Sequence, residues 1–270
     1  MRYIDFSLID QNDPEVKRWV RNASSKRAAL SALTTHTERR KFLQRKSNIL
    51  WKEFKPILIR YFGEKCWYSE CDLTGSFGDV DHFRPKLRSA DEYNHAILDE
   101  GYWWLAYDYL NYRLSCEKCN RLFGNGGKQD RFPLKPGTTP ATMPRKDDIP
   151  LLLDPCELQD VQLIDCDETG EIISLSRDSY EMNRVFVSKK IYNWNCFNTA
   201  RRDIRNRCKI ALELFEMAYE SDSDKLGQHL ALIMDLTDNL SPYSSFAKKY
   251  IKRNIEGKTY ESVLAAIILR

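Results

Sequence analysis

The sequence predicts an α+β fold in which a short, irregular centre lies between two helical regions. Apolar residues recur at spacings of three and four before residue 61 and again after residue 200, which predicts amphipathic helices. Between residues 62 and 135 this pattern stops, and Gly, Asp, Cys and aromatic residues occur in short runs. A strand–turn–strand pattern near 161–175 predicts a small β-hairpin.

The composition is that of an ordinary globular protein. Of 270 residues, 42 are Lys or Arg and 39 are Asp or Glu, which excludes a largely disordered, collagenous or low-complexity chain. Apolar runs such as Leu264 to Leu269 are too short to cross a bilayer, and the first residues lack the apolar segment of a secretory signal. We therefore expect a cytoplasmic protein without a membrane partner, whose eight cysteines are thiols or metal ligands.

The charge is unevenly distributed along the chain. Residues 1–61 hold 14 Lys or Arg against 6 Asp or Glu, whereas the rest of the chain is slightly acidic. A basic region can attract a phosphate backbone, because neutralising phosphates releases counterions. A basic run such as 38–46 can equally be the solvated face of a helix.

The N-terminal basic region, 1–61, is predicted to be helical. Asp13-Pro14 is an N-cap followed by proline at the first helical position. Four apolar residues then share a face: Val16, Trp19, Val20 and Ala23. A second helix is expected from Thr37 to Tyr61, with Pro56 kinking or dividing it.

Beyond the centre, residues 136–150 contain four prolines and are predicted to be a linker. The C-terminal region, 151–270, is expected to be mainly helical after a hairpin formed by 161–166 and 171–175. One helix carries an apolar stripe made by Ile204, Cys208, Leu212, Phe215 and Tyr219. Ser241-Pro242 is expected to open a later helix.

The centre contains the residues suited to chemistry. Residues 79–83 form a strand-like run that places Asp81 beside His82. Neighbouring side chains of a strand point to opposite faces, so a shared site there needs a bend or a twist. Downstream, Asn111 precedes a Cys-x-x-Cys-Asn run at 116–120, and such a bend commonly opens a helix that faces a metal or an anion.

These elements, in this order, resemble the HNH endonucleases, also called ββα-metal or His-Me finger nucleases. The matching residues are Asp81 and His82 on a first strand, Asn111 on a second and Asn120 at the start of a helix. The resemblance is closest to the HNH subunits of Septu-type and retron-associated anti-phage systems. It covers 62–156 through the strings DVDHFRPK at 79–86, WWLAYD at 103–108, CxxCN at 116–120, FPL at 132–134 and DIPLLLDPC at 148–156.

The resemblance implies that 62–135 is an HNH nuclease core embedded in the helical regions. His82 would be the general base, since an unperturbed imidazole has a pKa near 6.5, and Asn111 would hold the loop that orients it. Asp81 and Asn120 would bind a catalytic Mg²⁺ or Mn²⁺ through oxygen atoms. The expected nucleic-acid contacts are Arg84, Lys86, Arg121 and Lys128.

The implied function is metal-dependent hydrolysis of nucleic acid, with DNA favoured over RNA, as the effector of a two-component defence complex. The implied partner is an ABC-like ATPase, since this chain itself has no GxxxxGK[ST] phosphate loop. The alternative is a finger that has lost its chemistry and serves as a nucleic-acid-binding or adaptor subunit. An intact Asp81-His82 pair favours the enzyme.

The cysteines leave one question open. Cys66, Cys71, Cys116 and Cys119 can form a structural Zn²⁺ site that supports an irregular domain. Relatives with this site have CxxC in the first pair, and here Ser69 stands at the expected second position. Either Cys71 has replaced it in a longer knuckle, or the zinc is lost. The remaining cysteines are expected to be buried thiols: Cys156, Cys166, Cys196 and Cys208.

Two further groups of residues are expected to be structural. The histidines outside the motif, His36, His95 and His229, are interpreted as surface or packing residues. The aromatic residues Trp103, Trp104, Tyr107 and Tyr109 are expected to form a small core rather than base-stacking platforms.

Overall fold

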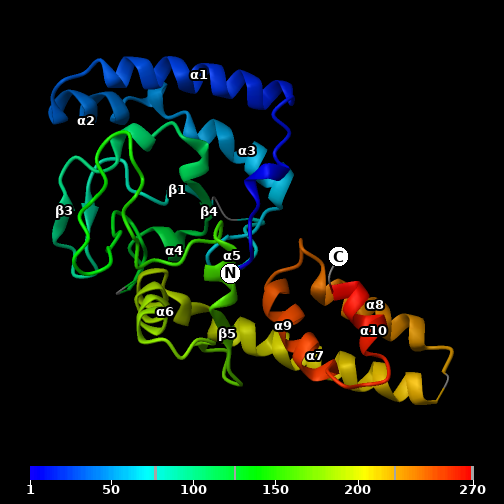
Figure 1. The fold of residues 1–270 in the computed structure, drawn as a ribbon. Coiled ribbons are helices and arrows are strands. Elements are labelled where there is room, and N and C mark those ends of the chain that lie inside the picture. The colour runs from blue at the N-terminus through cyan, green and yellow to red at the C-terminus, as the bar shows by residue number, and fades with distance from the viewer. Residues whose placement is uncertain (76–77, 125, 222, 269–270) are drawn as a thin grey trace.

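The computed structural model describes residues 1–75, 78–124, 126–221 and 223–268. It confirms the α+β class: helices are combined with three two-stranded antiparallel sheets in the described parts of the chain. The N-terminal helices lie over the region that contains β1 and β4, and helices α7 to α10 project to one side as a separate bundle (Figure 1).

The N-terminal region contains α1 (Pro14–Ser31), α2 (His36–Gln44) and α3 (Trp51–Phe62). As predicted, Asp13 caps α1, and its carboxylate accepts a hydrogen bond from the Glu15 amide at 2.8 Å. Val16, Trp19 and Ala23 are buried, but Val20 is 37% exposed and lies outside the buried face.

The prediction of one long helix divided at Pro56 was wrong. Pro56 lies inside α3, and the chain breaks instead between α2 and α3. There the Leu50 carbonyl accepts a hydrogen bond from the Trp19 indole at 2.8 Å, and the Asn48 carbonyl accepts one from the Tyr107 hydroxyl at 2.9 Å. Because these carbonyls are bound by distant side chains, tertiary contacts determine the break.

The centre is built on the antiparallel pair β1 (Asp79–His82) and β4 (Tyr112–Ser115), followed by the single-turn helix α4 (Glu117–Asn120). The register places Asp81 opposite Arg113 and His82 opposite Tyr112. A second short pair, β2 (Ser89–Ala90) and β3 (Ala96–Leu98), lies between them in the sequence.

Aromatic packing supports this centre, as expected. Trp103 and Tyr107 are buried, and Trp104 and Tyr109 are partly buried. Tyr109 stacks on Phe54 of α3 with ring centroids 5.0 Å apart. The aromatic residues therefore join the centre to the N-terminal helices.

Residues 136–150 contain no helix and no strand of a sheet, yet they are attached to the centre. The buried Asp148 carboxylate accepts hydrogen bonds from Arg84 at 2.7 Å and from the Tyr102 hydroxyl at 2.5 Å. The predicted loop or linker is thus an irregular segment that packs on the centre.

The C-terminal region begins with α5 (Leu158–Gln162) and the predicted hairpin, which is shorter than expected: β5 (Ile164–Cys166) and β6 (Ile172–Ser174). Its remaining helices are α6 (Ser179–Ile191), α7 (Asn198–Glu220), α8 (Leu226–Thr237), α9 (Ser244–Ile255) and α10 (Glu261–Ile268). Helix α9 begins after the predicted Ser241-Pro242 start. Among the described residues, no helix is both long and apolar enough to cross a membrane.

The apolar stripe of α7 is confirmed in part. Ile204, Cys208, Leu212 and Phe215 are buried, whereas Tyr219 is 37% exposed. Of the four cysteines expected to be buried, Cys166 and Cys208 are buried, Cys156 is partly buried and Cys196 is exposed.

Candidate active site

A cavity of about 510 Å³ lies where β1 ends and α4 meets the following loop. Asp81, His82 and Asn120 all line it, although 38 positions separate Asn120 from His82 in the sequence. The cavity is also lined by basic side chains from three parts of the chain: Arg40, Lys86, Arg88 and Arg121. The antiparallel pairing of β1 with β4, which leads directly into α4, produces this convergence.

The His82 ring is held at the end of β1 between two aromatic side chains. Its ring centroid lies 5.1 Å from that of Trp51 and 5.0 Å from that of Tyr112, both edge-to-face. Its Nε2 lies 3.1 Å from the Ala106 carbonyl oxygen. Because a carbonyl can only accept, this contact assigns the proton to Nε2 and leaves a lone pair on Nδ1.

The other ring nitrogen faces a lysine. Lys86 Nζ lies 3.3 Å from His82 Nδ1 and 4.4 Å from the centroid of the Trp51 ring. Burial, together with the nearby Lys86 charge, lowers the pKa of His82 well below its usual value. The imidazole is therefore neutral near pH 7 and can accept a proton.

Asp81 lies in a buried polar cluster. Its carboxylate accepts hydrogen bonds from the Tyr68 hydroxyl at 2.6 Å and from Lys128 Nζ at 3.1 Å. Lys128 also donates to the His82 carbonyl at 2.8 Å. Burial raises the pKa of Asp81, and the Lys128 ammonium opposes that shift. Lys128, predicted as a nucleic-acid contact, is fully buried and instead secures the end of β1.

Asn111 lies in a 3-10 turn immediately before β4, one residue short of the expected strand. Its side-chain oxygen accepts from the Arg84 amide at 2.9 Å, and its side-chain nitrogen donates to the Arg84 carbonyl at 3.0 Å. Its own carbonyl accepts from the Phe83 amide at 2.8 Å. Asn111 thus clamps the loop that follows His82 through both its side chain and its main chain.

Asn120 is the last residue of α4, not the first residue of a longer helix as expected. The helix stops after one turn because the returning chain binds its carbonyls: the Lys128 amide donates to Cys119 and the Gln129 amide donates to Asn120, each at 2.7 Å. The Asn120 side-chain nitrogen donates to Asp79 at 3.0 Å. Within the described residues, its amide oxygen accepts no hydrogen bond and is the atom left for another ligand.

The other predicted nucleic-acid contacts differ in their surroundings. Arg84 is bound to Asp148 and lies over the Phe132 ring, so it is engaged by the fold. Arg121 is 57% exposed and forms ion pairs with Asp79 and Glu117. Lys86 lines the cavity.

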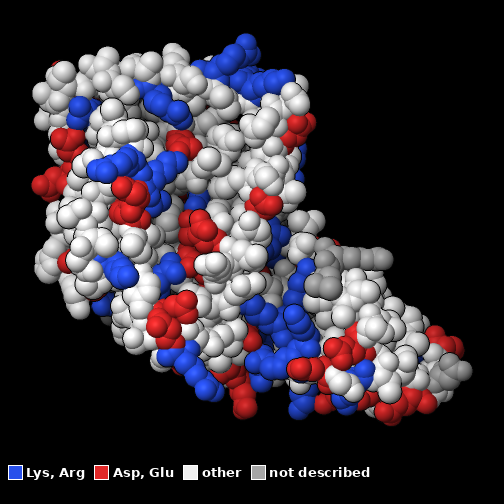
Figure 2. Space-filling model, in the orientation of Figure 1, with Lys and Arg blue, Asp and Glu red and all other residues white. Residues whose placement is uncertain are grey.

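Sequence reasoning missed Arg40, which α2 brings to the cavity from the N-terminal region. The only signal was the basic run at 38–46, and nothing in its spacing showed which side chain would reach the site. Figure 2 shows Lys and Arg side chains in several groups on the face drawn, with acidic side chains between them. The positive charge on this face is therefore divided into separate groups.

Cysteine side chains converge beside β4 and α4. The Sγ atoms of Cys66, Cys71 and Cys116 all lie within 4.8 Å of one another, so these residues could hold a metal ion. The buried Cys119 thiol interacts with those of Cys66 and Cys116. Ser69 is buried next to them, with its Oγ 3.8 Å from Cys116 Sγ.

The knuckle between Cys66 and Cys71 shows how the longer spacing is accommodated. Glu70 has a φ of 65°, a left-handed conformation that turns the chain, and the Cys66 amide donates to the Cys71 carbonyl at 2.9 Å. Burial by itself raises the pKa of the Cys66 thiol, but the neighbouring thiols and Ser69 together lower it well below its usual value. Cys71 thus belongs to the sulfur cluster, whereas Ser69 lies beside it.

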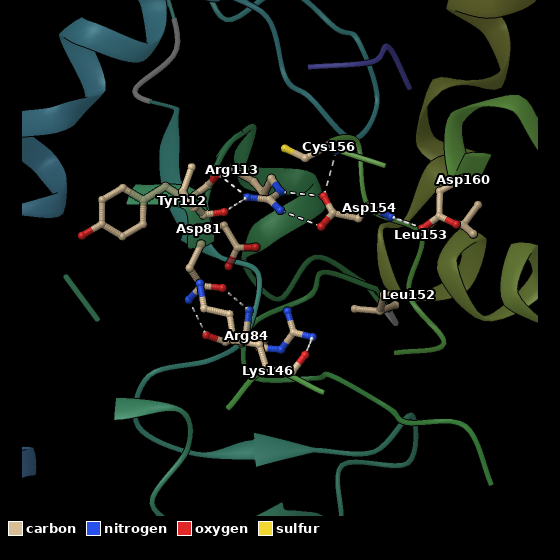
Figure 3. A network of polar contacts seen from close by, with 12 residues as sticks. Asp81, Arg84, Tyr112, Arg113, Lys146, Leu152, Leu153, Asp154, Cys156 and Asp160 are labelled. Atoms are coloured by element: carbon tan, nitrogen blue, oxygen red, sulfur yellow. Dashed lines mark hydrogen bonds and ion pairs between the residues drawn. The ribbon is translucent and has the colours of Figure 1, made fainter. Parts of the chain in front are cut away.

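A buried ion-pair network connects the centre to the C-terminal region (Figure 3). Arg113, opposite Asp81 in the sheet, donates two hydrogen bonds to Asp154, at 2.7 and 2.6 Å. The Asp154 amide donates to Asp160, which also pairs with Arg184 of α6. The segment after residue 148 is thereby fixed to the strand that flanks the candidate site.

The chain is similar in part to a known protein. No protein-family model matches this chain. The Septu protein PtuB of Bacillus mycoides (strain KBAB4) is 32% identical over 121 residues, which are 44% of this chain and 40% of that protein. The matched part is thus less than half of either chain. Over this part, the chain is similar to a Septu protein.

Proposed function

We propose that this chain is a metal-dependent HNH endonuclease that hydrolyses phosphodiester bonds of nucleic acid, DNA in preference to RNA. The observation that carries the proposal is the cavity lined by Asp81, His82 and Asn120 together with basic side chains. That combination provides a base, oxygen ligands for a cation and positive charge for a phosphate.

His82 is the proposed general base. Its Nε2–H is held by the Ala106 carbonyl, so Nδ1 is the atom that takes the proton of the attacking water. Asn111 is a positioning residue, because it clamps the loop that carries the imidazole. Lys86 lies near Nδ1 and would contact an oxygen of the scissile phosphate.

Asp81 and Asn120 are the proposed ligands of the catalytic cation. Both offer oxygen atoms at the cavity, which suits a hard ion such as Mg²⁺ or Mn²⁺. When bound, such an ion would stabilise negative charge on the phosphate and the leaving oxygen. Arg40, Arg88 and Arg121 would attract the adjoining phosphates.

We also propose that Cys66, Cys71, Cys116 and Cys119 bind a structural Zn²⁺. Four sulfur donors are the set that tetrahedral structural zinc prefers, and three of the four already lie within 4.8 Å of one another. The site would connect the segment before β1 to the start of α4. It would thereby stabilise the two elements that carry Asp81, His82 and Asn120.

The similarity to PtuB supports placing this chain in a Septu-like system. An ABC-like ATPase partner in a two-component complex is what the HNH resemblance implies, and it is part of this proposal. The similarity covers 40% of PtuB, so the ATPase partner of this chain is proposed and not established by the match. Co-purification with the ATPase subunit, using the full chain and variants lacking 1–60 or 180–270, would identify the docking region.

The decisive experiment compares cleavage of defined DNA and RNA by the wild type and by His82→Ala, with and without the ATPase partner. Loss of the base should lower the rate roughly 10²–10⁴-fold. His95→Ala is the matched control, since that side chain is 77% exposed and lies on a surface loop. Full activity of His82→Ala would remove His82 from the role of base.

Metal dependence is tested in the same assay. A chelator should abolish cleavage, and added Mg²⁺ or Mn²⁺ should restore it. Cleavage that resists chelation would contradict the proposed cation. Binding of nucleic acid without cleavage under every condition would favour the alternative, a non-catalytic adaptor subunit.

A further inference from the structure

Two large apolar side chains stand exposed at the edge of the candidate active site. Leu122 is 67% exposed and lines the cavity, and Phe123 is 50% exposed in the adjoining position. Single exposed apolar residues are common on proteins. An adjacent pair that borders a cavity lined by Asp81 and His82 is suited to bind a ligand with apolar faces.

The backbone that carries this pair is held in place. Phe123 and Gly126 exchange two hydrogen bonds, amide to carbonyl, each 3.1 Å long. The Asn193 side chain donates to the Phe123 carbonyl at 3.1 Å, and the Gly127 amide donates to the Ile191 carbonyl at 3.0 Å. The end of α6 therefore anchors Phe123 and Gly127 from outside.

Glycine is required where the chain returns to α4. Gly127 has a φ of +96°, and a Cβ at that position would lie 1.6 Å from the Arg121 carbonyl oxygen. A larger residue could not occupy it without moving the chain. The backbone at Phe123 and Gly127 is thus a fixed support, yet the apolar side chains that it carries remain in solvent.

Basic side chains flank the apolar pair. Lys118 Nζ lies 5.4 Å from the centroid of the Phe123 ring, and Arg121 precedes Leu122 on the cavity wall. An aromatic ring beside cations is the arrangement by which proteins bind an unstacked nucleobase together with its phosphates. Charge complementarity and continuity with the cavity thus favour a nucleic acid over an apolar protein surface as the occupant.

We propose that Leu122 and Phe123 form a base-contact rim, on which the nucleobase adjoining the scissile phosphate packs when it is unstacked from its neighbours. Arg121 and Lys118 hold the phosphates on either side of that base. The inference rests on the proposed nuclease function and deepens it, because it states how the substrate is held: by an unpaired base next to the cut.

The test measures binding of the full-length chain to a short single-stranded oligodeoxynucleotide by fluorescence anisotropy. The His82→Ala background prevents cleavage, so binding is measured independently of catalysis. Phe123→Ala should weaken affinity roughly tenfold, and Phe123→Trp should preserve it. Phe186→Ala is the matched control, because Phe186 is 67% exposed on α6 and should not affect binding.

An abasic site scanned along the oligonucleotide identifies the contacted base. One position near the cut should reproduce the loss seen with Phe123→Ala, and combining the two changes should cause no further loss. Additive losses, or an equal effect of Phe186→Ala, would overturn the inference. If Phe123→Ala does not fold, as judged by circular dichroism, Leu122→Ala provides the same comparison.

The outcomes separate this inference from the proposed function. A wild-type chain that shows the Phe123-dependent coupling but never cleaves would contradict the nuclease and leave the rim intact. A chain that cleaves normally while Phe123→Ala binds like the wild type would overturn the rim alone. A Phe123→Ala variant that loses only its protein partner would show that the rim docks a protein, and this would also overturn the inference. A chain that binds no oligonucleotide would overturn it as well.

Discussion

The centre of the molecule and its C-terminal helices are stabilised by different kinds of interaction. In the centre, strands of two to four residues are held by buried polar contacts, such as those of Asp81 with Lys128 and of Arg113 with Asp154. Helix α7 instead packs through an apolar stripe that includes Leu212 and Phe215. The centre thus adds direction-dependent polar contacts to its aromatic packing, whereas the α7 stripe relies on burial of apolar side chains.

This difference has a physical consequence for the site. Burial of apolar surface is non-directional, so it brings helices together without fixing a side chain to a few tenths of an ångström. Hydrogen bonds have preferred distances and angles, and buried charges require partners. The geometry of the candidate site therefore depends on polar contacts, each of which is costly to break.

The largest effect should come from the cysteine cluster. Cys66→Ser or Cys71→Ala should release the proposed zinc and unfold the centre, because structural zinc contributes on the order of 10 kcal/mol in small domains. Metal content by mass spectrometry and thermal unfolding would measure both losses. Ser69→Ala is the control and should keep its metal; loss of zinc from Ser69→Ala alone would assign the ligand to Ser69.

Breaking the buried ion pair should have the next largest effect. Arg113→Met leaves the Asp154 carboxylate buried without its partner and should cost about 3–5 kcal/mol in the free energy of unfolding, measured with urea. Adding Asp154→Leu removes the unpaired charge and should recover part of that loss. A double variant less stable than Arg113→Met would show that Asp154 is held mainly by other contacts.

For a substitution in the C-terminal helices, the comparison predicts a loss of stability without a decrease in the cleavage rate. Leu212→Ala removes a buried side chain of α7 and should cost about 2–3 kcal/mol through the cavity it leaves. Below the unfolding transition, the cleavage rate should equal that of the wild type. A reduced rate in the folded variant would show that α7 helps to position the site.

The smallest effect is expected at a surface ion pair of the same region. Lys258 lies 2.7 Å from Glu216, but their side chains are 46% and 32% exposed. Lys258→Ala should leave the unfolding temperature unchanged within error, because water and salt screen such pairs. A clear decrease would mean that charges also contribute to this bundle, and the contrast with the centre would be weaker.

Local patterns predicted much of the fold. The N-cap at Asp13, the hairpin near 164–174 and the buried stripe of α7 follow from capping and periodicity, which depend on neighbours in the sequence. The break after α2 could not be predicted in this way, because Trp19 and Tyr107 bind the carbonyls there.

In the candidate site, too, some features were predicted from the sequence and others depend on tertiary contacts. The motif residues Asp81, His82 and Asn120 were selected from the sequence, and they line one cavity. The exposure of Phe123 was not predicted, nor was the inward direction of Lys128. Both depend on how the chain leaves and returns to α4, which contacts with the end of α6 help to set.

The order of residues alone determined which groups are available for chemistry and where amphipathic helices form, since residue identity and short-range spacing are properties of the chain itself. Only the tertiary structure decided which cations reach the cavity, that Cys71 joins the sulfur cluster while Ser69 lies beside it, and how His82 is oriented. These features result from contacts between segments far apart in sequence, whose geometry exists only once the chain has folded.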